Sequence, residues 1–159
     1  MEIKIREVSA NDTGGIIGLM REFAEYEMLA ESLLITETKL AKALFDEGSF
    51  VEGLVALDGE RLFGYAIFYP HFSSFSGQVG YYLEDIFISA GHRGKAVGEK
   101  MLRTIAGKAR ARGFERIDFQ VLDWNKSAIT FYEKLGAVGN YDESHYKFAG
   151  EAFQNLASG

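Results

Sequence analysis

Apolar and polar residues alternate along several short stretches of the chain, which is typical of half-buried strands. Two of these stretches are separated by turn residues around Gly59, and this arrangement predicts a β-hairpin. The strands expected from the pattern cover residues 2–7, 49–58, 61–70, 81–89, 116–121 and 146–148. Residues 72–80 (FSSFSGQVG) lie between two of them and predict a loop, because serine and glycine dominate there.

Other stretches predict helices. Apolar residues from Ile16 to Ala24 recur three and four positions apart, as on one face of a helix, and Asn11 to Thr13 offer side-chain oxygens that can cap its start. A similar stripe with a basic outer face follows Val97. The expected helices cover residues 13–28, 36–48, 97–112 and 125–135.

The order of these elements indicates a mixed α/β (α+β) fold, with helices packed on a mostly antiparallel sheet. With 159 residues and no internal repeat, low-complexity tract or linker, we expect one domain spanning residues 1–159.

Composition narrows the function. The net charge of −6 argues against a general nucleic-acid or membrane-surface binder and mildly favours cationic small molecules as ligands. The chain has no cysteine, which excludes disulfides, a cysteine nucleophile and thiolate metal sites. His71, His92 and His145 are not spaced as metal ligands, so we expect no metal site and place all three at the surface.

The chain begins MEIKIREVS, which lacks the apolar block of a signal peptide. It also has no apolar run near the roughly 18 residues that span a bilayer. These features predict a soluble, cytoplasmic protein.

Residues 83–98 (LEDIFISAGHRGKAVG) combine two acids, an apolar strand and a basic turn containing glycine that leads into a helix. Main-chain N–H groups at a helix start favour anions, and basic side chains add to this preference. The stretch matches neither the Walker pattern nor the dinucleotide fingerprint GxGxxG, which argues against a P-loop nucleotide-binding protein. Taken alone, it is also compatible with an ordinary strand-to-helix turn whose basic tip is solvated.

A second motif changes this balance. Residues 124–137 (WNKSAITFYEKLGA) place Asn125, Ala128, Tyr132 and Gly136 in the spacing NxxAxxxYxxxG, about 30 residues after Arg93-x-x-Ala96-x-Gly98. Together the two motifs closely resemble the signature of the GNAT (GCN5-related) N-acetyltransferase superfamily. Within it, the stretches YYLEDIFIS and HRGKAVG are most similar to diamine (spermidine/spermine) and thialysine acetyltransferases.

The resemblance implies a GNAT fold, with helices on both faces of the sheet, a splayed fourth strand and a pyrophosphate loop before the third helix. It also implies acetyl-CoA as cofactor. The family's first loop glycine is Ala96 here, which fits without strain only if its φ angle is negative. The cofactor-binding residues implied by the resemblance are Ile86, Phe87, Ile88, Arg93, Gly94, Lys95, Ala96, Val97, Gly98, Glu99, Asn125, Ser127, Ala128 and Tyr132.

The implied catalytic residues are Tyr132, as general acid for the leaving thiolate, and Glu84, which would remove the proton of the substrate ammonium directly or through water. In a regular strand Asp85 would point to the face opposite Glu84, unless a bulge intervenes. The implied substrate-binding residues are Tyr26, Glu27, Glu84, Asp85, Asp118 and Gln120. Unlike the diamine enzymes, the chain has no acid within 72–80, and Ser144 stands where they carry a glutamate, next to Glu143.

The sequence therefore predicts an acetyl-CoA-dependent enzyme that transfers an acetyl group to a primary amine of a small cationic substrate, either a polyamine or a thialysine- or lysine-like amino acid. Two alternatives stay open: a GNAT acetyltransferase for another amine, such as an amino acid or a protein N-terminus, and a non-catalytic acyl-CoA-binding module. Relatives are commonly dimers, so we expect a homodimer to which residues 148–156 contribute.

Overall fold

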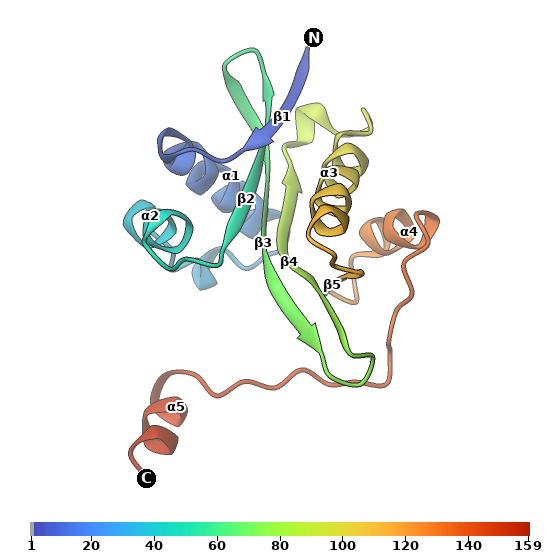
Figure 1. The fold of residues 1–159 in the computed structure, drawn as a ribbon. Coiled ribbons are helices and arrows are strands. Elements are labelled where there is room, and N and C mark those ends of the chain that lie inside the picture. Colours follow the sequence, from blue (N-terminus) through green and yellow to red (C-terminus); the bar gives the residue numbers. More distant parts are fainter. Residues whose placement is uncertain (1) are drawn as a thin grey trace. The chain divides into compact units, whose positions relative to one another are not determined.

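The computed structural model describes residues 2–159, which form two compact units that divide after Gln120. The first unit is built on a five-stranded sheet in the order β1-β2-β3-β4-β5 (Figure 1). Neighbouring strands run antiparallel except β4 and β5, which are parallel, so the sheet is mixed and mostly antiparallel as predicted. The strands are β1 (Ile3–Glu7), β2 (Glu52–Asp58), β3 (Arg61–Ser73), β4 (Gln78–Ile88) and β5 (Arg116–Phe119).

Three α-helices belong to this unit, and the start of each can be traced to local side chains or backbone. α1 (Thr13–Tyr26) follows a short 3-10 helix whose Asp12 carboxylate accepts the N–H of Ser9 at 2.7 Å. α2 (Glu37–Phe45) begins where the Thr36 hydroxyl accepts the N–H of Lys39. α3 (Val97–Ala111) follows the connection from β4.

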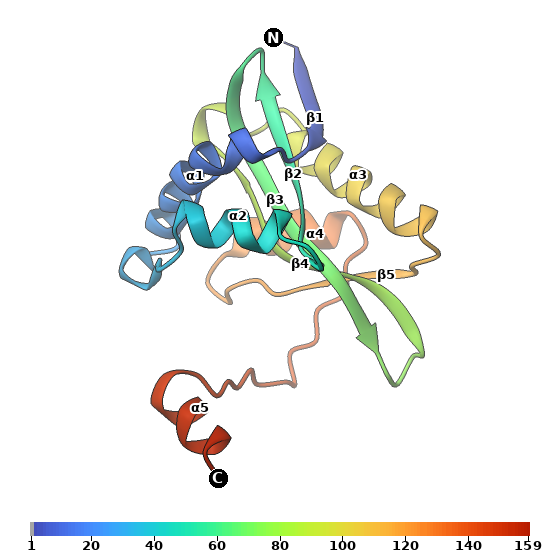
Figure 2. The ribbon, with the colours of Figure 1, turned by 60° about the vertical axis from the view of Figure 1, so that its left-hand side comes forward.

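The helices cover both faces of the sheet, as the resemblance implied (Figures 1 and 2). α1 and α2 pack on one face, where Ile16 and Leu40 belong to the same buried apolar cluster as Tyr65 and Phe87. α3 packs on the other face in a second cluster. Its largest members, all less than 2% exposed, are Leu54, Phe63, Phe68, Tyr81, Val97, Met101 and Ile105.

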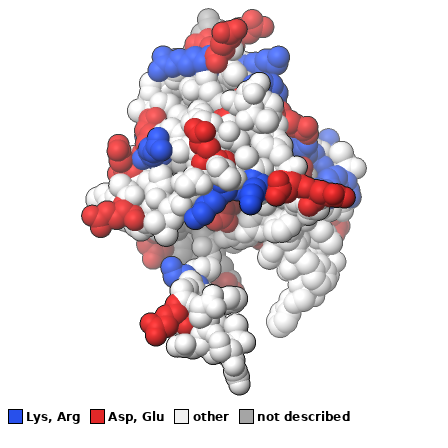
Figure 3. Space-filling model, turned by 90° about the vertical axis from the view of Figure 1, so that its left-hand side faces the viewer, with Lys and Arg blue, Asp and Glu red and all other residues white. Residues whose placement is uncertain are grey.

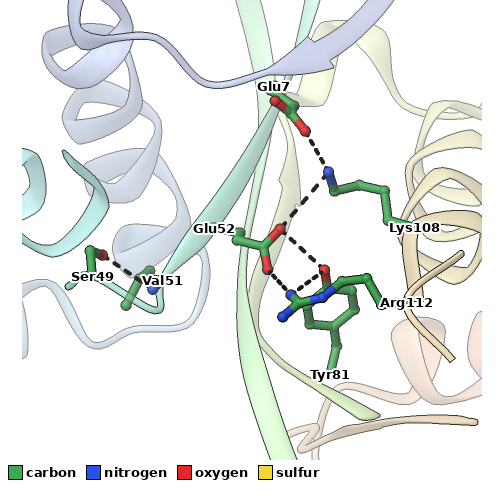
Figure 4. A network of polar contacts seen from close by, with 7 residues as sticks. All are labelled: Glu7, Ser49, Val51, Glu52, Tyr81, Lys108 and Arg112. Atoms are coloured by element: carbon green, nitrogen blue, oxygen red, sulfur yellow. Dashed lines mark hydrogen bonds and ion pairs between the residues drawn. The ribbon is translucent and has the colours of Figure 1, made fainter. Parts of the chain in front are cut away.

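A polar network fixes the C-terminal end of α3 to the sheet (Figure 4). Glu52 of β2 accepts hydrogen bonds from the Tyr81 hydroxyl at 3.1 Å and from Arg112 at 2.8 Å. Lys108 of α3 forms ion pairs with Glu7 and Glu52. Because a helix is stiff, these contacts also restrict where its N-terminus lies.

The pairing of β4 changes along its length. Only Gly80 to Leu83 pair with β5, from Arg116 to Phe119, whereas β4 continues to Ile88. Glu84 to Ile88 therefore have β3 on one side and no β5 partner on the other. This interruption corresponds to the splayed fourth strand of the predicted fold.

Two predicted elements are wrong. β3 extends to Ser73 and β4 begins at Gln78, so the loop between them covers only residues 74–77 and not 72–80. Polar residues can take part in the backbone pairing of a hairpin. The serine- and glycine-rich composition of residues 72–80 therefore placed both ends of the loop wrongly. No strand is present at residues 146–148. Alternation in a short stretch shows only which side chains would share a face of a strand, and it does not show that a neighbouring strand is there to pair with.

The second unit contains α4 (Lys126–Lys134) and α5 (Gly150–Ala157), of which α5 was not predicted. Residues 2–159 contain no helix with the length and apolarity that crossing a bilayer requires. The expectation that all three histidines lie at the surface is wrong for His92, which is 8% exposed. Its ring stacks on Phe63 with a centroid distance of 4.0 Å, so the imidazole serves as part of the packed interior.

Candidate active site

A β-bulge in β4 brings two carboxylates to the same face of the sheet. Ile67 of β3 pairs with Asp85 and Phe68 pairs with Leu83, which leaves Glu84 as an extra residue without an opposite partner. The extra residue resets the alternation of side chains. Both Glu84 and Asp85 therefore point to the α1–α2 side, where a regular strand would have separated them.

Two tyrosines of β3 bind these carboxylates. The hydroxyl of Tyr65 donates to Asp85, and the hydroxyl of Tyr69 donates to Glu84, each at 3.1 Å. The sequence analysis missed both tyrosines. Their even spacing within the predicted strand 61–70 placed them on one face, but only the strand register shows which residues they meet.

The electrostatics of this group favour a bound cation. The pKa of Asp85 is raised to about 6, mainly by burial and also by the charge of Glu84, although the hydrogen bond from Tyr65 lowers it. Glu27, at the end of α1, has its pKa raised by burial and by the charge of Asp85. Burial and Glu84 together raise the pKa of Tyr69 to about 12. Ionisation of Glu27 and Asp85 is therefore disfavoured, and a nearby positive charge would offset this cost.

This acidity is local. On the side of the molecule that α1 and α2 cover, acidic and basic side chains are interspersed and separated by broad uncharged areas (Figure 3).

The connection from β4 to α3 contains two residues with left-handed backbone. Gly94 has a φ of +76° and Ala96 a φ of +58°. The φ angle of Ala96 is therefore positive, so the alanine does not fit here without strain. This left-handed conformation costs an alanine about 1 kcal/mol relative to the glycine of the family motif. The hydrogen bond from the Lys100 N–H to the Ala96 carbonyl opens α3, so the N–H groups of its first turn have no carbonyl partner within the helix.

Arg93 folds back from this connection onto α1. Its Nε donates to the Ile88 carbonyl at 3.0 Å, and its guanidinium lies 4.8 Å from the ring centroid of Tyr26 and 5.3 Å from that of Phe87. Phe87 is 5% exposed and stacks on Phe23 of α1. The structure thus brings Tyr26 and Arg93 together, and it leaves Phe87 only its backbone for contact with a ligand.

Two predicted site residues belong to β5 or follow it, beside the N-terminal half of β4. Asp118 of β5 accepts two hydrogen bonds from Arg116, at 2.9 and 2.8 Å, and lies 3.3 Å from the Nε2 of His71. Arg116 therefore already compensates its charge. Gln120 follows the end of β5.

The second unit holds the other predicted residues on α4. The Asn125 side chain is the N-cap and accepts the N–H of Ala128 at 3.3 Å, and Ser127 also donates to it. Gly136 follows the helix with a φ of +99°, which favours glycine. The asparagine and glycine of the second motif therefore mark the start and end of α4, and Tyr132 lies in its last turn.

Comparisons with known proteins agree with these motifs. The model of the acetyltransferase (GNAT) family matches residues 17–137. Thialysine N-epsilon-acetyltransferases of Sus scrofa and Bos taurus are 35% and 36% identical, over 98% of this chain and 97% of each relative. Among solved structures, an integron cassette protein from the mobile metagenome of V. cholerae has a TM-score of 0.81 at 25% identity and covers 100% of this chain and 99% of its own. This chain belongs to the acetyltransferase (GNAT) family and is an acetyl-CoA-dependent N-acetyltransferase.

Proposed function

We propose that the enzyme acetylates a primary amine of a small cationic substrate, either a thialysine- or lysine-like amino acid or a polyamine. The observation that carries this proposal is the group of three carboxylates, Glu27, Glu84 and Asp85, around the β4 bulge. The raised pKa values of Glu27 and Asp85 favour a ligand that brings positive charge. The full-length similarity to relatives named for thialysine supports the same substrate class.

We infer that the first turn of α3 and the connection before it hold the cofactor diphosphate. Left-handed backbone at Gly94 and Ala96, main-chain N–H groups at the start of α3 and the basic side chain of Lys95 suit the chemistry of phosphate groups. The proposed set for this group is Arg93, Gly94, Lys95, Ala96, Val97, Gly98 and Glu99.

The unpaired side of β4 suits an extended ligand. Ile86, Phe87 and Ile88 lie beyond the end of β5 pairing, so the backbone there can pair with a pantetheine arm as a strand would. When bound, acetyl-CoA supplies the thioester carbonyl that an amine attacks. Asn125, Ser127 and Ala128, at the start of α4, are the proposed contacts from the second unit.

The carboxylates have separate roles in this proposal. An alkylammonium has a pKa near 10 and must lose a proton before it attacks a carbonyl. Glu84, which is exposed and held by Tyr69, accepts this proton directly or through water. Asp85 and Glu27 hold the cation, with Tyr26 beside them at the end of α1. Asp85 is the second candidate for the acceptor, because a pKa of about 6 is close to neutral pH.

Tyr132 is the proposed general acid, whose hydroxyl donates a proton to the departing sulfur. It lies seven residues after Asn125, which is two helical turns, and the two residues therefore share one side of α4. An unperturbed phenol, with a pKa of about 10, can protonate a thiolate whose conjugate acid is stronger by a unit or two.

A thiol-release assay tests the substrate class. The enzyme is supplied with acetyl-CoA and, in separate reactions, thialysine, lysine, spermidine, putrescine and a peptide with a free N-terminus. Strong turnover of one of the first four supports the proposal, whereas turnover of the peptide alone contradicts it. Tyr132→Phe should lower kcat at least about tenfold and leave coenzyme A affinity nearly unchanged. The matched control is Tyr146→Phe, at a tyrosine that is 88% exposed.

We also propose that the protein is a homodimer and that the C-terminal segment 138–159 contributes to the interface. This segment exposes many large apolar side chains, namely Val138, Tyr141, Tyr146, Phe148, Phe153 and Leu156. Light scattering on the full chain should give twice the monomer mass, and the double substitution Phe153→Ser and Leu156→Ser should reduce it. A monomer in the unmodified chain would contradict this. We further propose a cytoplasmic location, and cell fractionation should recover the protein in the cytosolic fraction.

A further inference from the structure

The C-terminal half of α1 forms hydrogen bonds with the connection that follows β4. The Glu22 carboxylate accepts hydrogen bonds from the Ser89 hydroxyl at 3.0 and 3.1 Å and from the Ala90 N–H at 3.2 Å. Ser89 is the N-cap of the short 3-10 helix Ala90–His92, and its own side chain forms no cap bond there. A carboxylate from a helix 67 positions earlier in the chain therefore takes the place of that cap.

A second contact lies one turn further along α1. Tyr26 is four residues after Glu22, on the same side of the helix, and its ring lies beneath the Arg93 guanidinium. Arg93 in turn donates to the Ile88 carbonyl. α1 thus holds the segment from Ile88 to Arg93 at both ends, immediately before the residues with left-handed backbone.

Such fixation matters because the next residues are strained. Ala96 has a φ of +58°, and a non-glycine residue keeps this conformation only when its surroundings determine it. Several N–H groups bind one anion tightly only when they already converge on it, since ordering them during binding weakens affinity. The connection is exposed from Arg93 to Ala96 and depends on its entry for order.

We propose that Glu22 is a positioning residue for the cofactor: it fixes Ser89 and Ala90, and through them the loop that binds the diphosphate, without contacting the cofactor itself. The inference rests on the proposed placement of the diphosphate at Arg93–Glu99. In this proposal α1 has two roles: it packs on the sheet and it positions the connection before α3.

Calorimetry with coenzyme A on the full chain tests the proposal. Glu22→Ala removes the acceptor and should raise the Kd about tenfold, whereas Glu22→Gln keeps one acceptor oxygen and should raise it about threefold. The Michaelis constant for acetyl-CoA should rise by the same factors while kcat changes less than about twofold, because Glu22 touches no reacting group. The matched control is Glu25→Gln, at an exposed glutamate of the same helix, which should leave the Kd unchanged.

Hydrogen exchange gives a readout that is independent of activity. The amides of residues 89–99 should exchange faster in Glu22→Ala than in the unmodified chain, while those of β2 and β3 should keep their protection. Uniformly faster exchange would instead indicate general destabilisation and would contradict a positioning role. If Glu22→Ala fails to fold, Ser89→Ala, which removes only the hydroxyl donor, decides between the same outcomes.

One further variant separates failure of this inference from failure of the proposed cofactor loop. Lys95→Glu places a negative charge in the loop and should weaken coenzyme A binding about tenfold or more. If Lys95→Glu has no effect, the diphosphate binds elsewhere and the proposed placement is wrong. If Lys95→Glu weakens binding but Glu22→Ala does not, the placement stands and the positioning role of Glu22 is wrong.

Discussion

The two faces of the sheet at β4 differ in chemistry although one strand supplies both. Toward α3, Leu83 joins Phe63, Phe68, Met101 and Ile105 in an apolar cluster that is closed to water. Toward α1, Glu84 and Asp85 bind Tyr69 and Tyr65. One extra residue at the bulge produces this difference, because it turns both carboxylates to the same side. A packed face and an acidic face are thereby built into a single strand.

The two faces also differ in their effect on stability. Burial of Leu83 and its neighbours stabilises the fold in proportion to the apolar area removed from water. Burial of Asp85 does the reverse at neutral pH, since its pKa rises from 3.8 to about 6. This shift corresponds to about 2 to 3 kcal/mol in favour of the unfolded state once the group is ionised. The acidic face therefore reduces stability, as is common where a site serves function.

The largest expected effect comes from Asp85→Asn. The amide keeps an acceptor for Tyr65 but carries no charge, so kcat/KM for a cationic amine should fall about a hundredfold or more. The free energy of unfolding should rise at neutral pH, because an uncharged group replaces a carboxylate that is costly to bury. Urea titrations and steady-state kinetics measure the two effects.

The pH dependence of this stability gain has a defined sign. Between pH 3.8 and about 6 the folded chain keeps a proton on Asp85 that the unfolded chain has lost, so the unmodified protein loses stability as pH rises through this window. The gain from Asp85→Asn should therefore be absent below about pH 4 and complete above about pH 6. A gain that does not depend on pH would show that charge burial is not its cause. Asp46→Asn, at an exposed aspartate after α2, is the control.

The matching change on the apolar face is Met101→Ala. Met101 is fully buried, and its truncation should lower the free energy of unfolding by about 2 to 5 kcal/mol. The Michaelis constant for the amine should stay constant at temperatures where the variant is folded, because no residue of the acidic face is touched. A large change in that constant would show that the two faces are coupled. The exposed neighbour Lys100→Ala should change neither quantity.

A smaller effect on the acidic face is expected from Glu84→Gln. Removal of the proposed proton acceptor should lower kcat/KM about tenfold at neutral pH and shift its pH profile toward higher pH, where more of the amine is already neutral. If instead Asp85 accepts the proton, the profile of Glu84→Gln will keep its position. The control Glu60→Gln lies in the β2–β3 turn, where the glutamate is exposed.

The difference between the faces also explains what the sequence could predict. Alternation and helical spacing located all five strands, α1 to α4 and the mixed sheet, because these patterns report which side of each element is buried. The same alternation left the direction of Asp85 open, since a bulge is a property of the β3–β4 register and leaves no mark in one strand's sequence. The inward turn of His92 and the contacts of Tyr65 and Tyr69 were missed for the same reason: they depend on residues distant in the chain.

The motifs gave a different kind of information. Asn125 and Gly136 were noticed for their spacing, and the structure gives each a local role at an end of α4. The sequence also showed that alanine replaces the loop glycine at position 96. It could not predict the φ angle of Ala96, because that angle depends on how the connection from β4 to α3 is folded.

The smallest expected effect tests that connection. Ala96→Gly should raise the free energy of unfolding by about 0.5 to 1 kcal/mol, because glycine accepts the left-handed conformation freely and the relief exceeds the greater entropy it gives the unfolded chain. Ala106→Gly, at an exposed position inside α3, should have the opposite sign and cost about 1 kcal/mol. Thermal unfolding of the pair measures both. If the two substitutions destabilise equally, the left-handed conformation of Ala96 carries no strain.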